Sequence, residues 1–271
     1  MPELPEVETT RRGIAPALIG RRVIDVIVRD RRLRWPIAPE LEAAITHQTV
    51  RRVERRAKYI LIGFDAGTLI VHLGMSGSLR VLDVRVPPRL HDHWDMVIDS
   101  GKVLRFHDPR RFGSAHWTVS NPLEHTLLSK LAPEPLSDGF DAQYLFRATR
   151  KRSVAVKQFI MNSRLVVGVG NIYASEALFR AGIAPRRPAG RVTRAQAAAL
   201  ARAIKDVLTE AIEIGGTTLR DYVNADGVPG YFRQKLFVYE RGGQACRVCK
   251  TRIKQFAQGQ RSTYWCSVCQ R

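Results

Sequence analysis

The sequence lacks the marks of a membrane-spanning or disulfide-rich protein. No apolar run reaches the roughly 18 residues that suggest a membrane span. The N-terminus is acidic where a secretion signal would be basic, and no apolar stretch follows it. Cysteine is scarce, and all four residues lie between Cys246 and Cys269, which argues against a disulfide framework spread through a secreted fold. These absences predict a soluble, intracellular protein.

Acidic residues are few beside the basic ones. The chain of 271 residues carries 44 Lys and Arg against 25 Asp and Glu, a formal net charge of +19. Most of the positive charge is arginine, which binds phosphate groups through a bidentate fork. Because a fold does not need such an excess, it predicts a polyanionic partner. Nucleic acid is favoured over a membrane surface, since no basic amphipathic helix with a broad apolar face stands out.

The first half of the chain has the pattern of a β-rich domain that follows one helix. Residues 4–18 predict an opening helix, distorted by Pro16 and followed by Gly20. Short strands are predicted after it, with hairpins that turn at 65–67 and at 100–101. Apolar residues on both faces of these strands favour a sandwich or a barrel.

The pattern turns helical beyond residue 122. Residues 216–232 lack periodicity, and a loop of that length in a compact domain is usually functional or mobile. Thr193 and Gln196 form a capping-box signature ahead of an alanine-rich stretch. The segments predicted here are a helix over 123–131, a linker at 132–135, and helices over 153–161, 171–180 and 193–214.

The cysteines carry the strongest local signal. Cys246 and Cys249 form one C-x2-C pair, Cys266 and Cys269 form another, and 16 residues separate the pairs. This spacing predicts a four-cysteine zinc site, with redox pairs as the weaker alternative. Four thiolates fill the coordination sphere, so the zinc should be structural. Arg261 and other basic residues between the pairs fit a finger laid on DNA, although solvated charges or a protein contact stay open.

The N-terminus carries a second chemical signal. Loss of Met1 would leave Pro2 as a free secondary amine, and N-terminal amines attack sugar aldehydes to form Schiff bases. The adduct of a secondary amine is an iminium that cannot lose its charge by shedding a nitrogen proton. Glu3 and Glu6 could then move protons. Taken alone, the segment is more simply a helix start, because proline suits the first turn and acids suit the positive end of the dipole.

Several further residues have both a functional and a structural interpretation. Asn171 follows a glycine-rich segment at a helix start, where backbone N–H groups can bind phosphate or merely cap the helix. Lys58 could be a surface lysine, and His72, on a predicted strand, could be structural. Met75 and Phe112, in loops at strand ends, could enter a base stack or pack in the core.

Together these motifs resemble bacterial formamidopyrimidine-DNA glycosylases, the 8-oxoguanine repair enzymes. The similarity runs essentially from end to end and rests on several motifs in the same order. Ser267 is one departure, since many relatives have proline after the third cysteine. The matching segments are Met1–Thr9, Arg56–Tyr59, His72–Gly77, Asp108–Gly113, Val167–Glu176, Asp221–Gly227 and the four cysteines.

The resemblance implies an α+β multidomain fold. An N-terminal β-sandwich flanked by helices would precede a helix-two-turn-helix domain with a four-cysteine zinc β-hairpin, and DNA would lie between the two halves. The expected divisions are a catalytic domain at 1–121, a linker and connecting helix at 122–150, a helix-two-turn-helix domain at 151–235 with a lesion-capping loop at 216–232, and a zinc finger at 236–271.

The resemblance also implies roles for individual residues. Pro2 would attack C1′ of the damaged nucleotide, with Glu3 beside the amine and Glu6 supporting proton transfer, and β- and δ-elimination would follow. Flipping of that nucleotide is required because C1′ is inaccessible within a stacked duplex. Lys58 counts among the catalytic residues and also matches a position that holds a phosphate, as do His72, Asn171 and Arg261. Lys157 is a further expected DNA contact. The space vacated by the flipped nucleotide would be filled by Met75, Arg110 and Phe112.

The implied substrate is double-stranded DNA that contains oxidised purines. Leu4, Arg110, Phe112 and the segment Asn224–Gly227 favour this assignment over the related endonuclease VIII family, which prefers oxidised pyrimidines. A non-catalytic damaged-DNA-binding protein is the alternative from another class, although it would have no reason to keep Pro2 with its acids. We expect one structural Zn²⁺, a monomer, no membrane association and a cytoplasmic location at the bacterial nucleoid.

Overall fold

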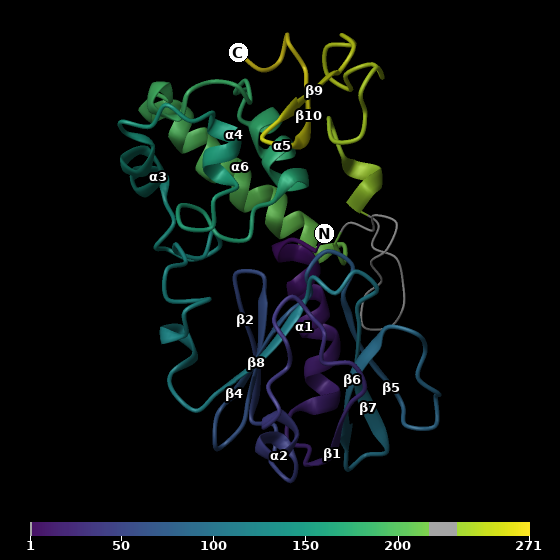
Figure 1. The fold of residues 1–271 in the computed structure, drawn as a ribbon. Helices are drawn as coiled ribbons and strands as arrows, with labels where there is room; N and C mark the ends of the chain where they lie inside the picture. The colour runs from purple at the N-terminus through teal and green to yellow at the C-terminus, as the bar shows by residue number, and fades with distance from the viewer. Residues whose placement is uncertain (1, 217–231) are drawn as a thin grey trace. The chain divides into compact units, whose positions relative to one another are not determined.

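Figure 1 shows the computed structural model of the chain, which describes residues 2–216 and 232–271. The described chain forms two compact units, residues 2–129 with 214–216 and residues 130–213 with 232–271. The first unit holds two antiparallel sheets, and the second holds helices and a C-terminal hairpin. The predicted α+β architecture is therefore confirmed. Within the described residues, no helix is both long and apolar enough to cross a membrane.

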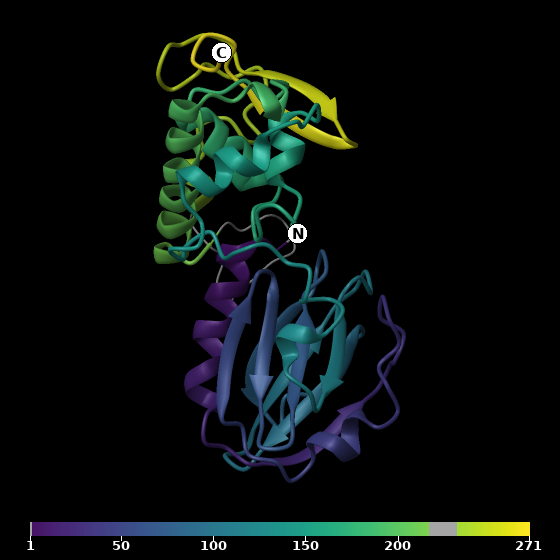
Figure 2. The ribbon, with the colours of Figure 1, turned by 90° about the vertical axis from the view of Figure 1, so that its left-hand side faces the viewer.

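The first unit is a β-sandwich with a helix packed against it (Figure 2). One sheet has the strand order β1-β6-β7-β5 and the other β2-β3-β4-β8. Apolar side chains from both sheets, among them Trp94, Phe106, Ile60 and Val71, form one core with the buried face of α1. The elements are α1 (Leu4–Leu18), β1 (Val23–Val28), α2 (Leu41–Ile45), β2 (Arg52–Arg56), β3 (Tyr59–Gly63), β4 (Thr68–His72), β5 (Ser78–Asp83), β6 (Asp92–Ile98), β7 (Lys102–His107) and β8 (Ser114–Thr118).

Both predicted hairpins are confirmed. β3 pairs with β4 across a turn in which Phe64 N–H donates to Gly67 O at 2.8 Å. β6 pairs with β7 across a turn at Gly101, whose φ of +75° suits glycine because other side chains are strained in the left-handed region. These two turns set the register that carries β4 and β7 to the loops described below.

The helix predicted over 123–131 is wrong. The segment forms only the 3₁₀ turn η1 (Pro122–Glu124), which the Asn121 side chain caps by accepting Leu123 N–H at 3.1 Å, and further turns follow it. Leu123 is exposed and Leu128 is buried. A short helix in water needs an apolar face packed on a core to hold it, and this segment has only one fully buried side chain.

The second unit follows the predicted helical pattern more closely. The capping box of the long helix is confirmed, because Gln196 N–H donates to Thr193 Oγ1 at 3.2 Å and Thr193 N–H donates to Gln196 Oε1 at 3.1 Å. The predicted loop at 216–232 lies outside the described residues except at its two ends. The elements are α3 (Ala142–Thr149), α4 (Val156–Ile160), α5 (Asn171–Arg180), η2 (Ala189–Arg191), α6 (Arg194–Glu213), η3 (Phe232–Lys235), β9 (Lys254–Gln258) and β10 (Arg261–Trp265).

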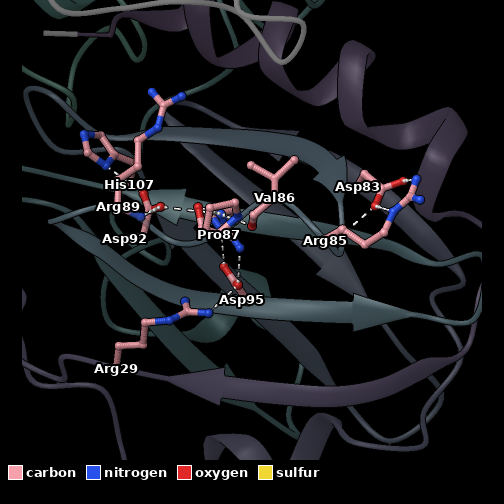
Figure 3. A network of polar contacts seen from close by, with 10 residues as sticks. Arg29, Asp83, Arg85, Val86, Pro87, Arg89, Asp92, Asp95 and His107 are labelled. Atoms are coloured by element: carbon pink, nitrogen blue, oxygen red, sulfur yellow. Dashed lines mark hydrogen bonds and ion pairs between the residues drawn. The ribbon is translucent and has the colours of Figure 1, made fainter.

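A buried network of charges lies in the β1-β6-β7-β5 sheet (Figure 3). Arg105, 2% exposed, donates two hydrogen bonds of 2.8 Å to the two carboxylate oxygens of Asp95 and further bonds to the carbonyls of Val86 and Pro87. Arg29 adds a 2.6 Å contact to Asp95. Burial alone would raise the pKa of Asp95, but the hydrogen bonds from Arg105 and Arg29 hold that pKa below its usual value. The charges are thus buried with their partners.

Candidate functional site

The start of α1 places two buried acids directly after Pro2. Pro2 is buried, and Glu3 and Glu6 are each 2% exposed. The Glu3 backbone N–H donates to Glu6 Oε2 at 2.8 Å, which ties the first turn of the helix together. The positive end of the helix dipole favours negative charge at this position. The structure therefore brings Pro2, Glu3 and Glu6 together. The same residues form the start of α1, so the structural interpretation of this segment as a helix start holds as well.

Lys58 and His72 lie at one end of the β2-β3-β4 sheet. Ala57, at a φ of +52°, and Lys58 form the turn between β2 and β3, and β3 pairs Tyr59 with His72 at the end of β4. The Tyr59 and His72 ring centroids are 4.8 Å apart. Lys58 therefore precedes β3 by one residue and lies where the sheet ends.

His72 is neutral at physiological pH. Burial, and then the charges of Lys58 and Arg34, lower the pKa of His72 to about 4. Its Nδ1 accepts the Gly74 N–H at 3.0 Å, so the ring proton is on Nε2. A neutral imidazole in this tautomer can donate one hydrogen bond from Nε2, which suits contact with a phosphate oxygen as well as a structural role.

Met75, Arg110 and Phe112 belong to two neighbouring loops of the first unit. Met75 follows β4 and is half-buried, whereas Arg110 and Phe112 lie in the loop between β7 and β8. Phe112 is 42% exposed, so core packing does not account for it. The Arg110 guanidinium lies 5.0 Å from the centre of the Phe112 ring. The two exposed side chains thus form one cation–π pair at the loop tip.

In the second unit, Lys157 and Asn171 both contact the β10 backbone next to Arg261. Lys157 is 1% exposed, and its Nζ donates to Thr263 Oγ1 at 2.7 Å and to Ser262 O at 3.2 Å. Asn171 Nδ2 donates to the same Ser262 O at 3.0 Å. Arg261 is exposed and begins β10. The structure therefore brings these three predicted DNA-binding residues together.

Two details of this cluster differ from the sequence interpretation. Asn171 does not cap α5, because Gly170 is the N-cap and the Asn171 side chain bonds to the hairpin instead. Lys157 is a buried lysine, although its position on a short apolar helix offered no sign of a partner. The partners could not be seen from the sequence, since Ser262 and Thr263 are more than a hundred residues away.

The four cysteines form a compact sulfur cluster. All four thiols are free, and their sulfur atoms lie within 4.8 Å of one another. The Cys246 and Cys269 sulfurs are 3.9 Å apart, and those of Cys249 and Cys266 are 3.3 Å apart. A zinc ion with bonds of about 2.3 Å to four tetrahedral sulfurs would separate them by roughly 3.8 Å. The donor set and its size therefore fit one structural Zn²⁺.

Buried polar residues that the sequence analysis did not single out anchor the zinc finger. Glu176, 1% exposed on α5, accepts the backbone N–H groups of Phe237, Val238 and Tyr239 at 2.8–2.9 Å. Gln270 accepts Cys266 N–H at 2.9 Å and donates to Ile183 O at 3.0 Å. Because their partners are backbone groups, and all but Cys266 are more than 60 residues away in the sequence, no pattern marks these two side chains.

Three family models match successive parts of the chain. They are described as the formamidopyrimidine-DNA glycosylase N-terminal domain (residues 1–115), the formamidopyrimidine-DNA glycosylase H2TH domain (131–223) and a zinc finger found in FPG and IleRS (243–271). Among curated proteins, the formamidopyrimidine-DNA glycosylase of Thioalkalivibrio sulfidiphilus is 61% identical and that of Stutzerimonas stutzeri 58% identical, each over 100% of both chains.

Solved structures are similar over nearly the whole chain. The MutM (Fpg) protein of Thermus thermophilus has a TM-score of 0.89 at 38% identity, covering 99% of this chain and 98% of that one. The Lactococcus lactis Fpg in complex with DNA containing an abasic site has a TM-score of 0.92 at 30% identity, covering 99% of both. The same Lactococcus protein, at the same score and identity and covering 100% of both, was solved with DNA containing an oxidised pyrimidine.

Proposed function

The chain belongs to the formamidopyrimidine-DNA glycosylase family, whose members are DNA glycosylases of DNA repair, and on that premise we propose that it excises oxidised purines from duplex DNA and then cleaves the strand. The substrates are 8-oxoguanine and formamidopyrimidines, and the partner is double-stranded DNA bound by a monomer. The observation that carries the proposal is the buried pair Glu3 and Glu6 directly after Pro2.

Chemistry begins at the nitrogen of Pro2 once Met1 is removed. The secondary amine attacks C1′ of the damaged nucleotide, the N–C1′ bond forms, and the C1′–base bond breaks with its electron pair leaving on the base. Glu3, next to the amine, supplies and accepts the protons of this step. Opening of the sugar ring gives an iminium at C1′. Because that cation acidifies C2′, loss of a C2′ proton expels the 3′ phosphate, and a second elimination expels the 5′ phosphate.

Glu6 has two roles in this scheme. Its carboxylate accepts the Glu3 backbone N–H, which fixes the residue that carries the first acid. It also lies close to the end of the described chain at Gly216, where an added Cβ would come within 3.2 Å of Glu6 Oε1. The Glu6 carboxylate therefore has close neighbours at Glu3 and at Gly216. Its second role is to accept a proton at the opened sugar.

Positively charged and polar side chains hold the DNA backbone. In the first unit these are Lys58 and the neutral His72, and in the second unit Asn171 and Arg261, which Lys157 supports from below the hairpin. The damaged nucleotide must flip out, because C1′ cannot be reached inside a stacked duplex. The space that it leaves is filled by Met75, Arg110 and Phe112. The zinc ion fixes the hairpin and takes no part in the chemistry, since four thiolates leave it no open position.

An oxidised-pyrimidine glycosylase is the alternative within the same superfamily. Because the similar Lactococcus Fpg was solved with DNA that contains an oxidised pyrimidine, the experiment below includes an oxidised-pyrimidine substrate. A non-catalytic damaged-DNA-binding protein is the alternative from another class. It would have no need of buried acids directly after Pro2, and it would bind lesions without cutting them.

Borohydride trapping tests the proposal and separates the alternatives. Protein with Met1 loss verified by mass spectrometry is mixed with duplexes that carry 8-oxoguanine opposite cytosine or thymine glycol. A reduced adduct at Pro2, stronger with 8-oxoguanine, supports the proposal; a stronger adduct with thymine glycol favours the pyrimidine enzyme. No adduct on either duplex leaves only a binding protein.

Three altered proteins sharpen the same experiment. Pro2→Gly keeps an N-terminal amine and should retain part of the trapping, whereas protein that keeps Met1 should give none. Glu3→Gln preserves the volume of the buried side chain but not its acid, and should slow base excision by about 10²–10⁴-fold. Full strand cleavage by protein with verified Met1 would falsify the Pro2 mechanism.

A further inference from the structure

The loops of Met75 and of Arg110 with Phe112 are joined by one buried carboxylate. Asp108 is 0% exposed and begins the second loop. Its Oδ1 accepts the Ser76 hydroxyl at 2.7 Å, and its Oδ2 accepts the Gly113 N–H at 2.7 Å. The two ends of the 108–113 loop and the loop after β4 therefore share one side chain.

Ser76 extends this connection toward Arg110. Its side chain is 6% exposed, and its oxygen accepts the Arg110 N–H at 3.3 Å while its proton goes to Asp108. The Ser76 hydroxyl thus lies one residue after Met75 and bonds the backbone of Arg110. This chain of bonds runs from one predicted DNA-inserting residue to another.

The backbones of the two loops also touch directly. A Cβ at Gly74 would lie 2.4 Å from Gly113 N and 2.4 Å from the carbonyl carbon of Phe112, so a side chain there cannot be accommodated. Gly74 has a φ of +65°, which also favours glycine. The two loops are therefore packed backbone against backbone at Gly74.

The backbone of Asp108 is fixed from the sheet side. Its N–H donates to His91 O at 3.0 Å, and its carbonyl bonds His93 Nε2 at 2.9 Å. His93 is 0% exposed. The backbone of Asp108 is therefore bonded to His91 and His93, around the start of β6, while its carboxylate bonds both loops.

We propose that Asp108 is a positioning residue which, through Ser76, locks the two loops so that Met75, Arg110 and Phe112 enter the duplex as one preset unit. The inference rests on the proposed function, because it needs these three side chains to fill the space left by the flipped nucleotide. Its basis is preorganisation: side chains whose loops are already ordered lose less freedom when they insert.

Asp108→Asn isolates the connection. Asparagine has the same volume but only one acceptor oxygen. If that oxygen keeps the Gly113 N–H, the NH₂ faces Ser76, whose hydroxyl can then accept from residue 108 but no longer donate to it. In the other orientation two donors face each other at Gly113, so in either case the native connection is disturbed. Ser76→Ala removes the same connection without a new donor, and serves if Asp108→Asn folds poorly. Asp83→Asn is the control, because Asp83 is exposed at the end of β5 and its side chain bonds only Arg85 among the described contacts.

The experiment compares two substrates in single-turnover reactions. One is a duplex with 8-oxoguanine paired to cytosine, which must be opened and filled; the other is a single strand with an abasic site, which needs neither. We expect Asp108→Asn and Ser76→Ala to slow excision from the duplex by about 100-fold, as expected for a misplacement of the order of 1 Å. Trapping on the abasic strand should match wild type, and Asp83→Asn should match it on both.

A fluorescence readout makes the role distinguishable from stability. 2-Aminopurine next to the lesion brightens when its stack is opened, and both variants should reduce that amplitude at a temperature well below their measured Tm, where they are fully folded. Equal loss on both substrates would show a general structural role, and no loss on either would show no role; both overturn the inference. Failure of the wild-type protein on the duplex would instead overturn the proposed function.

Discussion

The ammonium of Lys157 lies 2.7 Å from the hydroxyl oxygen of Thr263, and the lysine is almost fully buried. The contact joins α4 to β10 across more than a hundred residues of sequence. The residue before its second acceptor, Ser262, is the exposed Arg261. Lys157 therefore fixes the part of the hairpin that carries a predicted phosphate contact.

Replacement of Lys157 by methionine tests whether it supports the hairpin or binds DNA itself. Methionine fills a similar space but removes the Lys157 donor from the Thr263 hydroxyl and leaves Ser262 O with the Asn171 bond, which should lower the free energy of unfolding by about 1–3 kcal/mol. DNA affinity should fall while the slope of log K against log salt stays unchanged. Arg261→Gln should do the reverse, leaving Tm unchanged and reducing the slope by about 0.9. A reduced slope in Lys157→Met would contradict the supporting role.

Interactions between residues close in the sequence could be predicted from it, whereas interactions between distant residues could not. The hairpins, the Thr193 capping box and the cysteine cluster follow from neighbouring residues, because turns, caps and C-x2-C pairs are short-range patterns. Burial of Lys157 and the connection made by Asp108 could not be predicted in the same way. Their partners are 106 and 32 residues away in the sequence, and only the fold brings them together.

The sites themselves show the same division. The order Pro2, Glu3, Glu6 can be read directly, since all three lie within five residues at the start of the chain, but their burial cannot. The helix predicted over 123–131 was wrong because its leucines suggested an apolar face that tertiary packing does not use. Sequence patterns thus locate chemistry, and packing decides which candidates are accessible.

Zinc removal should affect the second unit and spare the first. Each chain should release one Zn²⁺ to a chelator, since the four sulfurs form one cluster. The small core around Phe179, Val238 and Ile253 should then loosen, because it packs on the cysteines. We expect a lower melting transition for the metal-free protein, a second transition near that of the holoprotein, and weaker DNA binding. Val248→Ser, between two ligands but exposed, should keep the metal. Unchanged melting and binding after metal loss would contradict the structural role.

The low pKa of His72 should make stability depend on pH. The folded-state pKa is about 4, lowered chiefly by burial, against about 6.5 for an unfolded histidine. Between these values the unfolded chain binds the proton more readily, so the contribution of His72 is complete above pH 6.5 and is lost as pH falls toward 4.

His72→Asn is the variant that measures this contribution. Asparagine keeps a side-chain oxygen that can accept the Gly74 N–H but does not titrate in this range. Urea unfolding at pH 7 and pH 5 should show a smaller loss of stability on acidification in the variant than in wild type. An identical loss in both proteins would mean that His72 is not held neutral by its surroundings.

Arg105 and Arg85 form a matched pair of arginines near the same sheet, one buried and one exposed. Arg105→Met would leave the buried Asp95 with only Arg29 as a charged partner and should lower the free energy of unfolding by about 3–5 kcal/mol. Arg85→Met removes an exposed ion pair with Asp83, which solvent already screens, and should leave Tm near that of wild type.

A double variant shows whether the loss in Arg105→Met comes from the uncompensated charge or from lost packing. Asp95→Asn combined with Arg105→Met removes both charges of the central pair, so it should be more stable than Arg105→Met alone. Chemical denaturation of wild type, the two single variants Arg105→Met and Asp95→Asn, and the double variant gives the coupling free energy of the pair. If the double variant is less stable than Arg105→Met, the pair contributes mainly through its shape and its bonds to the Val86 and Pro87 carbonyls, because restoring charge balance then recovers nothing.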